Sequence, residues 1–458
     1  MYGLVDCNNF FVSCERVFDP RLNGKKVVVL SNNDGCVIAR SNEAKAAGIP
    51  MGCPAFKIKE HTDPRQVIQL SARHILYRDL SNRVMNILGQ EVENVQQYSV
   101  DEAFFVLPHE DVETSHRAMA NVVKRVKQYV GIPVSVGFAP TRTLAKIANH
   151  IAKKDRRITD GVYWLVRPEA IDIILRRTAI EDVWGIGRRL TAKLKARGIM
   201  TAADFVKIPP SLVRSQYSVT LERTQRELMG HDCQIANPVT IAHKSIMTSR
   251  TFGKILTNRD EIADAIVSFA ERVARQLRDE GSVAGSIMTY VRGDHFREDL
   301  PFYSNSCQLQ LDTPSSDTMT IVRQALNAFY NIWREGFGYR KAGVMALDIQ
   351  HGGAIQLNVF DPDDHGKLRR LMTSIDGINN MYGNRSIKLA PGLQRGEWAP
   401  NQNHFQALSK TLHFYTGMTH FYPIQDRPKS IDEEKDVWGD NVDQTVDDDY
   451  INDNNNNN

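Results

Sequence analysis

The sequence predicts a multidomain α+β protein, and three observations support this fold class. Residues up to about 165 alternate strand and helix patterns, residues 166–236 carry helix patterns alone, and residues 240–350 follow the order strand, helix, strand, strand, helix, strand. A chain of 458 residues is also longer than one hydrophobic core usually serves. Several domains are therefore expected.

The composition excludes some classes of protein. Hydrophobic residues make up 42% and charged residues 24%, as in ordinary soluble domains. No apolar run approaches the roughly 18 residues that cross a bilayer, and the start has no basic region followed by an apolar stretch. We therefore expect a cytoplasmic protein. Six scattered cysteines, without the close pairs of a zinc site, are expected to be reduced thiols with packing roles.

The small net charge of +3 conceals an uneven distribution. Residues 431–458 contain ten Asp or Glu and one Lys, so residues 1–430 carry 56 basic and 44 acidic side chains. A body with this surplus suits a polyanionic partner.

The first elements place an acid at a junction between strand and helix. Residues 2–6 alternate as a strand, and Asn8 and Asn9 can cap the helix that the spacing of Phe10, Phe11, Cys14 and Val17 predicts. The next predicted elements are strands at 25–30 and 37–39, helices at 41–48 and 71–88, a strand at 98–106, a helix at 116–129, a strand at 133–138 and a helix at 141–154.

Asp6, Asp101 and Glu102 are candidate metal ligands. Each lies in or beside an apolar strand pattern, where a charge needs a partner. Phosphoryl transfer with two divalent ions uses hard oxygen ligands from several parts of a chain, and the Cys7 carbonyl could complete this set. Because neighbours on a strand face opposite ways, Asp101 is the safer ligand, while Glu102 requires a strand end, a bulge or a water bridge. The alternative is that each acid forms a salt bridge with a nearby Lys or Arg.

The helical stretch contains Gly185-Ile-Gly187 between two helix patterns, which predicts a helix-hairpin-helix. Glycine amides can approach a phosphate closely, and Arg188, Arg189 and Lys193 add positive charge. The alternative is an ordinary helix hairpin.

The later βαββαβ pattern predicts a split βαβ, ferredoxin-like domain. Its strands are expected at 244–252, 284–293, 305–311 and 342–350, and its helices at 259–280 and 317–334. Lys244, Arg250, Lys254 and Arg292 lie on or beside these strands and could follow a sugar-phosphate backbone. A solvated sheet face is the alternative.

After Gly352-Gly353 the chain presents a short apolar and aromatic peptide. Its residues, Gln356, Leu357, Asn358, Val359 and Phe360, could bind in a partner's pocket or form a short strand. Residues 361–422 are expected to form a small unit or to fold upon binding. The acidic end of the chain is predicted to be disordered.

Five segments, in this order, resemble the Y-family of translesion DNA polymerases. They are Asp6-Cys-Asn-Asn-Phe-Phe11, Ser31-Asn-Asn-Asp-Gly-Cys-Val-Ile-Ala-Arg40, Asn42-Glu-Ala-Lys45, Tyr98-Ser-Val-Asp-Glu-Ala-Phe104 and Gly137-Phe-Ala-Pro-Thr-Arg-Thr-Leu-Ala-Lys146. The asparagine-rich second segment is similar to the UmuC branch, the catalytic subunit of bacterial DNA polymerase V with its plasmid-borne relatives. The similarity covers about residues 1–422.

The resemblance implies the right-hand architecture of polymerases, and the chain then divides into six parts. They are the palm (1–9 and 71–165), the small fingers (10–70), the helix-hairpin-helix thumb (166–236), the little finger (240–350), a clamp-binding peptide with an UmuC-type C-terminal region (351–422) and an acidic disordered tail (423–458).

By resemblance, the carboxylates are catalytic metal ligands for two Mg²⁺ ions, with Mn²⁺ as a possible substitute. The nucleotide site includes Phe10, with Phe11 as the steric gate at the sugar 2′ position. Asn42, Lys45 and Lys153 fall where the family contacts the triphosphate. Many relatives have Tyr, Tyr and Arg where this chain has Phe11, Asn42 and Lys45. A second acid is common in relatives at the position of Asn8, so the third carboxylate falls to Glu102.

The resemblance also implies a function and partners. The function is error-prone, template-directed extension of a primer with dNTPs, in DNA damage tolerance and SOS mutagenesis, at the nucleoid. The partners are primed or damaged DNA, the sliding clamp through Gln356–Phe360, an UmuD-type protein dimer and the RecA filament. A metal-dependent nuclease and a DNA-binding scaffold without catalysis are the alternatives.

Overall fold

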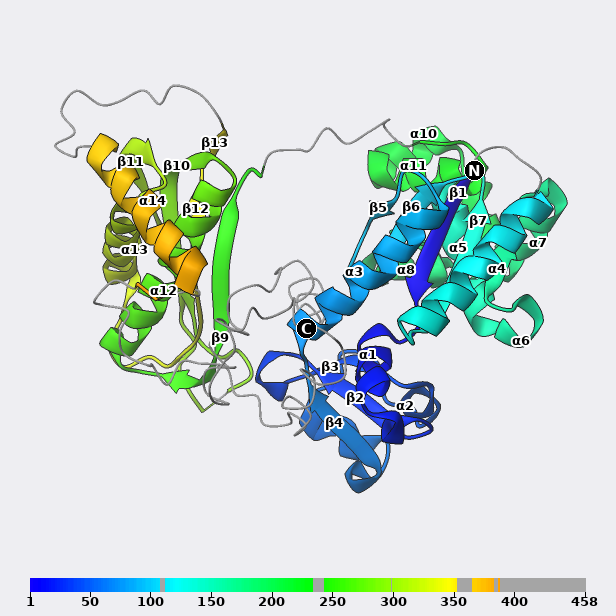
Figure 1. Cartoon of the computed structure of the whole chain (residues 1–458), viewed down its shortest axis with the longest axis horizontal. Helices are drawn as coiled ribbons and strands as arrows, with labels where there is room; N and C mark the ends of the chain where they lie inside the picture. Colours follow the sequence, from blue (N-terminus) through cyan, green and yellow to red (C-terminus); the bar gives the residue numbers. More distant parts are fainter. Residues whose placement is uncertain (108–111, 234–242, 298, 352–364, 383–385, 388–458) are drawn as a thin grey trace. The chain divides into compact units, whose positions relative to one another are not determined.

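The structure is a computed structural model that describes the chain except residues 108–111, 234–242, 298, 352–364, 383–385 and 388–458 (Figure 1). The described residues form two units, which we treat separately. Of the described residues, unit 1 takes in Met1–Val29 and those between 37 and 233, and unit 2 takes in Leu30–Cys36 and those between 243 and 387.

The centre of unit 1 is a five-stranded sheet with the order β5-β6-β1-β7-β8. The strands are β1 (Tyr2–Cys7), β5 (Gln96–Gln97), β6 (Glu102–Val106), β7 (Val134–Ala139) and β8 (Val162–Trp164). The first strand of the chain lies in the middle and pairs antiparallel with both β6 and β7. Every residue of β7 is buried, so this strand is covered on both faces.

Helix α5 (Arg142–Lys154) packs closely on this sheet. A side chain at Gly137 of β7 would place its Cβ 2.1 Å from the amide nitrogen of Asn149, so the approach of the helix requires glycine. The buried Asn149 amide donates hydrogen bonds to the carbonyls of Ser135 (2.8 Å) and Leu4 (3.3 Å). These contacts fix α5 over β1 and β7.

A smaller sheet of order β3-β2-β4 lies in the following segment. It consists of β2 (Lys26–Leu30), β3 (Val37–Arg40) and β4 (Val67–Ser71), and is accompanied by α1 (Phe10–Phe18), α2 (Asn42–Ala46), α3 (His74–Glu91) and α4 (Val112–Tyr129). Helix α1 is joined to the start of α3 by buried Glu15, which pairs with Arg73 and accepts a hydrogen bond from the Tyr77 hydroxyl (2.7 Å). This pairing satisfies the buried charges.

The rest of unit 1 is mainly helical, as predicted. Its helices are α6 (Arg156–Thr159), α7 (Pro168–Arg177), α8 (Arg188–Lys195), α9 (Ala202–Val206), α10 (Pro210–Gln216) and α11 (Val219–Leu228). Short 3-10 turns occupy Pro20–Leu22, Ala55–Glu60, Pro64–Gln66 and Ile180–Asp182 of unit 1, and Asn32–Asp34 in the segment assigned to unit 2. One apolar core runs from Leu4 and Phe104 of the sheet to Leu194 and Phe205 of the helices.

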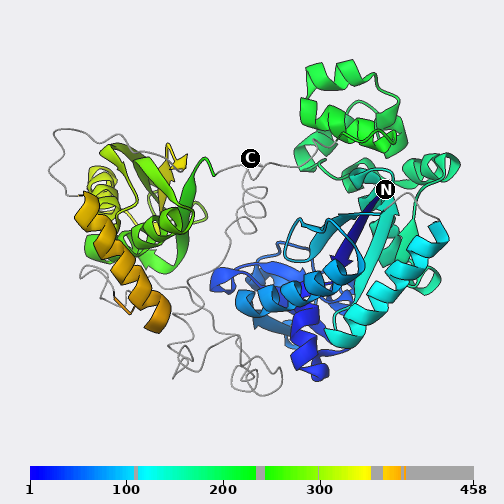
Figure 2. The same ribbon diagram turned by 45° about the horizontal axis from the view of Figure 1, so that its top comes forward.

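Unit 2 has the predicted βαββαβ order. Its elements are β9 (Ile246–Leu256), α12 (Arg259–Asp279), β10 (Ser282–Arg292), β11 (Ser304–Ser315), α13 (Thr318–Ile332) and β12 (Tyr339–Leu347). The strands form an antiparallel sheet of order β11-β10-β12-β9, against which both helices pack. Two further elements follow, β13 (Gln350–His351), which pairs with β10, and α14 (His365–Tyr382). Helix α14 runs along the outside of this unit in both views (Figures 1 and 2).

No helix in the described parts of the chain is long and apolar enough to cross a membrane.

Candidate active site

The three candidate carboxylates come together at one end of β1. Asp6 lies directly opposite Glu102 in the β1–β6 register. The amide of Cys7 donates a 2.9 Å hydrogen bond to the carbonyl of Asp101, which brings the third acid to the same strand end. Residues about 95 positions apart thus contribute to one site.

A turn in the backbone before β6 allows the two neighbouring acids, Asp101 and Glu102, to share one site. The predicted strand at 98–106 is too long, because β6 begins at Glu102 and residues before it form a turn. The Ser99 hydroxyl donates to a carboxylate oxygen of Asp101 (2.6 Å) and accepts from the amides of Asp101 (3.2 Å) and Glu102 (3.0 Å). Asp101 therefore precedes the pleated strand, and the alternation of strand side chains does not apply to this pair.

Burial makes this end of the sheet costly for charge. Asp6 is 6% exposed, and its Oδ1 has no hydrogen-bond partner among the described residues. Burial, with smaller contributions from Asp101 and Glu102, raises the pKa of Asp6 to about 8, despite the opposing effect of Lys153. Burial also raises the pKa of Asp101. A divalent cation would relieve all of these penalties together.

Two lysines of α5 contact the acids. Lys153 pairs with Asp6, and Lys146 pairs with Glu102 at 3.0 Å. The ammonium group of Lys146 also lies 4.9 Å from the ring centres of Tyr98 and Trp184. Asp6 and Glu102 thus form the lysine salt bridges that the alternative interpretation expected, whereas the carboxylate of Asp101 accepts a hydrogen bond from Ser99.

The donor set fits divalent ions of the magnesium type. It consists of carboxylate oxygens, one of which, the buried Oδ1 of Asp6, has no hydrogen-bond partner among the described residues. Lysine ammonium groups pair with two of the three acids. As the side chains stand, the described residues contain no group of three His, Cys, Asp or Glu arranged to hold a metal. Cys7 is buried and the pKa of its thiol is raised well above the ordinary value, so its carbonyl is the available donor.

Polar side chains from α2 reach the same strand end through Asn9. Asn9 has a left-handed backbone (φ 49°), and its side-chain amide donates to the Oδ1 of Asn42 at 2.9 Å. Lys45 donates to the Oδ1 of Asn9 at 2.6 Å. The structure therefore brings Asn42 and Lys45 together, with Asn9 as the connecting residue that sequence reasoning missed.

Arg40 is a second residue that the sequence reasoning did not assign to the site. It lies at the end of β3, donates to the carbonyl of Ile49 (2.6 Å), and with Lys153 lowers the pKa of Lys45, although burial is the larger cause. Its position two residues before Asn42 was the available signal. Arg40, Lys45 and Lys153 together make this region suitable for a polyphosphate.

Phe11 lies on the buried side of α1. It is 8% exposed, stacks on Tyr77 with ring centres 4.3 Å apart, and meets His74 edge to face at 5.8 Å. Phe10 is also buried. Because Tyr77 is itself held by Glu15, the Phe11 ring has a fixed support.

The predicted glycine turn precedes α8. Gly185 has φ +87°, a conformation that favours glycine, and Gly187 is the N-cap of the helix. Arg188, the first helical residue, is exposed. This is the geometry expected of a helix hairpin.

Two of the four basic residues predicted on or beside the strands of unit 2, Arg292 and Arg250, lie on opposite faces of its sheet. Arg292 is paired in register with Lys341, which is paired with Thr251. Arg250 is opposite buried Ala342, on the other face of the sheet, and bonds to the carbonyl of Ser249 (3.3 Å). The predicted clamp-binding residues 356–360 and the acidic tail lie outside the described residues.

Comparison with known proteins decides the family. The profile of the impB/mucB/samB family matches residues 5–150, and that of its C-terminal domain matches residues 243–359. Protein UmuC of Salmonella typhimurium (strain LT2) is 41% identical over 87% of this chain and 95% of its own length. The chain belongs to the UmuC branch of the Y-family polymerases. Protein ImpB of Salmonella typhimurium is 39% identical over 83% of this chain and 90% of its own length.

More distant relatives agree with this membership. DNA polymerase IV of Pelotomaculum thermopropionicum is 27% identical over 85% of this chain and 94% of its own length. A solved Y-family DNA polymerase chimera has a TM-score of 0.59 and 20% identity, covering 77% of this chain and 99% of the chimera. The predicted right-hand polymerase fold is therefore confirmed.

Proposed function

We propose that the chain is an error-prone translesion polymerase that uses Asp6, Asp101 and Glu102 to transfer a nucleotidyl group from a dNTP to a primer 3′-OH. As a Y-family member, it is a DNA-directed DNA polymerase with DNA and dNTPs as substrates. The observation that carries the proposed chemistry is the convergence of three carboxylates at one strand end, with a buried Asp6 oxygen that lacks a partner among the described residues.

Two divalent ions, Mg²⁺ or alternatively Mn²⁺, would be held by these carboxylates and the Cys7 carbonyl. When bound, they would supply Lewis acidity for both the attacking and the leaving oxygen. The chain's own residues contribute binding and orientation. Ser99 fixes the direction of the Asp101 carboxylate, and the turn before β6 lets Asp101 and Glu102 share one end of the sheet.

The basic and amide groups beside the acids are proposed to bind the triphosphate. Asn42, Lys45 and Lys153 are joined by Arg40, and Asn9 positions two of them. Phe10 and Phe11 are proposed to border the sugar, with Phe11 excluding a 2′ hydroxyl. The Phe11 ring is suited to this role because Tyr77 holds it against displacement.

DNA contacts are proposed for Gly185, Gly187 and Arg188 of the thumb hairpin and for Arg250 and Arg292 of the little finger. The thumb glycines leave backbone amides accessible to a phosphate. Arg292 and Lys341 are like charges in register on one sheet, an arrangement that a phosphate would stabilise.

We propose the same partners that the family resemblance implies. They are the sliding clamp at Gln356–Phe360, an UmuD-type dimer and a RecA filament, in SOS mutagenesis at the nucleoid. A tether to the clamp would increase the residence time of a polymerase that holds mainly the DNA backbone.

The test is primer extension on an abasic template with four dNTPs and Mg²⁺, with and without UmuD-type protein and RecA. Asp101→Asn should abolish extension and leave binding of primed DNA within about twofold, because one ligand is lost at unchanged volume. Asp172→Asn, a change at an exposed acid of α7, is the matched control. Extension by Asp101→Asn would reject the site, and template cleavage without dNTP incorporation would indicate a nuclease.

A further inference from the structure

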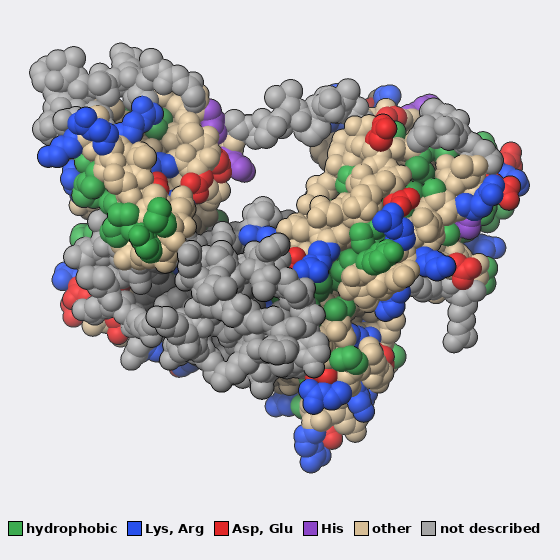
Figure 3. Space-filling model, viewed as in Figure 1, with side chains coloured by type: hydrophobic (Ala, Val, Ile, Leu, Met, Phe, Trp, Pro, Cys, Tyr) green, Lys and Arg blue, Asp and Glu red, His purple; other side chains and the backbone are tan. Residues whose placement is uncertain are grey.

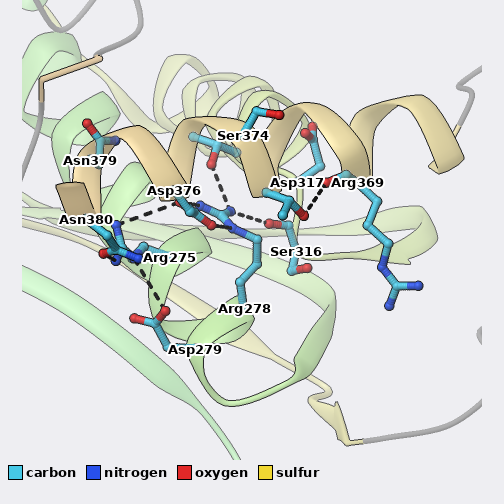
Figure 4. A network of polar contacts seen from close by, with 12 residues as sticks. Arg275, Arg278, Asp279, Ser316, Asp317, Arg369, Ser374, Asp376, Asn379 and Asn380 are labelled. Carbon is cyan, nitrogen blue, oxygen red and sulfur yellow. Dashed lines mark hydrogen bonds and ion pairs between the residues drawn. The ribbon is translucent and has the colours of Figure 1, made fainter. Parts of the chain in front are cut away.

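Helix α14 is attached to unit 2 by a defined polar contact. Arg278 of α12 forms a two-point ion pair with Asp376 of α14, at 2.6 and 2.9 Å (Figure 4). The same guanidinium donates to the carbonyl of Ser316 (2.8 Å) and the hydroxyl of Thr318 (3.0 Å). A second arginine, Arg275, bonds to Asn380 at 2.5 Å. The face of α14 that meets α12 is therefore fixed.

Apolar packing supports the same orientation. Met372, one turn before Asp376, is 3% exposed. Arg369, seven residues before Asp376, lies on the same side of the helix as Asp376 but outside the ion-pair network (Figure 4). The outer side of α14 is the one that faces solvent.

This outer face of α14 is unusually apolar for a surface that is exposed to solvent. Leu371 and Ile378 are 43% and 38% exposed, and Met381 and Tyr382 are 65% and 67% exposed. The N-terminal half of this face adds the exposed bases Lys367 and Arg370. Figure 3 shows hydrophobic side chains gathered in the region where Figure 1 draws α14, with basic side chains beside them. Such a surface suits a partner that is apolar along one side and acidic around it.

The C-terminal sequence has this chemistry. Trp438, Val442, Val446 and Tyr450 recur at intervals of four residues, and the positions between them are Asp, Asn, Gln, Thr or Gly. In a helix this spacing places the four apolar side chains along one side. Residues 431–458 also hold ten acids and one Lys, which complements the basic half of α14.

The length of the intervening chain permits the contact. More than fifty residues separate Tyr382 from Trp438. A flexible segment of that length has an end-to-end distance of roughly 40 Å, whereas α14, with 18 residues, is about 27 Å long. A segment tethered in this way has a high effective concentration at the helix.

We propose that residues 437–451 of the same chain dock on the outer face of α14, with their apolar side chains on Leu371, Ile378 and Tyr382 and their acids toward Lys367 and Arg370. The segment then covers an apolar surface of the little finger that would otherwise be exposed. A partner for this surface must first displace it, and high salt weakens the docking because part of the contact is between charges.

Hydrogen–deuterium exchange of the full-length chain tests this proposal. Trp438→Asp with Val446→Asp should speed exchange of the α14 amides by about fivefold or more, since the helix loses a contact that suppresses its opening. Gln444→Asp with Thr445→Asp adds the same charge between the apolar positions and should have little effect on α14.

A reciprocal variant guards against an indirect effect. Met381→Asp with Tyr382→Asp should speed exchange of residues 437–451, while the unfolding temperature of the chain checks that the fold is intact. Equal exchange of α14 in the wild type and in both tail variants would overturn the proposal. Protection of α14 that disappears on dilution, or that arises only when another protein is added, would assign the surface to a second copy or to a partner and would equally overturn it.

Discussion

At the scale of single residues, the buried carboxylate of Asp6 suits its proposed role as a metal ligand but destabilises the fold when no metal is bound. In the absence of metal, Asp6→Asn should stabilise the fold by about 1–3 kcal/mol, because it removes the charge of a carboxylate whose burial outweighs its pairing with Lys153. The pKa of about 8 in the folded state lies above the ordinary 3.8, so Asp6 lowers the free energy of unfolding progressively as pH rises from about 4 to 8. The gain should therefore be larger at pH 8 than at pH 5.

Thermal unfolding with a chelator measures this difference, at roughly 2–4 °C per kcal/mol for a unit of this size. Asp172→Asn serves again as the exposed control. Adding Mg²⁺ should raise the unfolding temperature of the wild type more than that of Asp6→Asn. A lower unfolding temperature for Asp6→Asn in chelator at pH 8 would contradict the assigned strain.

Phe11 carries a second prediction at this scale. Phe11→Ala should raise ribonucleotide incorporation by about tenfold or more, since removal of a ring held by Tyr77 opens space beside the sugar. Single-nucleotide incorporation with matched rNTP and dNTP measures the ratio. Phe56→Ala, which removes a ring that is 71% exposed, is the control. An unchanged ratio in Phe11→Ala would remove Phe11 from the gate.

At the scale of elements, the contact between α5 and β7 depends on one glycine. Gly137→Ala should cost at least about 3 kcal/mol or prevent folding, because the added Cβ would lie 2.1 Å from the backbone of Asn149. Gly89→Ala, in α3 with no atom within 4 Å of the new Cβ, should instead stabilise by up to about 1 kcal/mol. Urea unfolding of the two variants compares them, and similar midpoints would refute the close packing.

Elements with strong periodicity were predictable from sequence. The helix expected at 259–280 is found at Arg259–Asp279, since its apolar residues cover one sustained face. Helix α14 was missed, although Leu371, Ile375 and Ile378 recur at helical spacing in a segment otherwise described as a small unit or one that folds on binding. Strand β4 was also missed, because five residues give little periodic signal.

The candidate site was predictable in its acids but not in its connections. Asp6, Asp101 and Glu102 were recognisable because charge in an apolar strand pattern needs an explanation. The turn before β6 was not, since Ser99 bonds to nearby amides in competition with a strand that the surrounding residues favour. The link from Asn9 to Lys45 joins residues far apart in sequence, which local patterns do not report.

At the scale of the whole molecule, the proposed clamp tether gives a test that separates recruitment from catalysis. Deleting Gln356–Phe360 should reduce extension with the sliding clamp present, and leave extension without the clamp unchanged. The reason is that a tether raises local concentration without entering the chemical step. Replacing the same five residues by a Gly/Ser segment keeps the chain length constant. Equal loss with and without clamp would indicate a structural role for the peptide.

The central position of β1 also has a consequence for synthesis of the chain. Its two neighbours, β6 and β7, are made about 100 and 130 residues later, so the N-terminal strand has no sheet to join for roughly 5–25 s at 5–20 residues per second. During this time Leu4 and Val5, which the finished fold buries, are open to aggregation or to a chaperone. The sheet β3-β2-β4, made within residues 26–71, can form earlier. Folding of the five-stranded sheet is thus delayed until its last long strand leaves the ribosome.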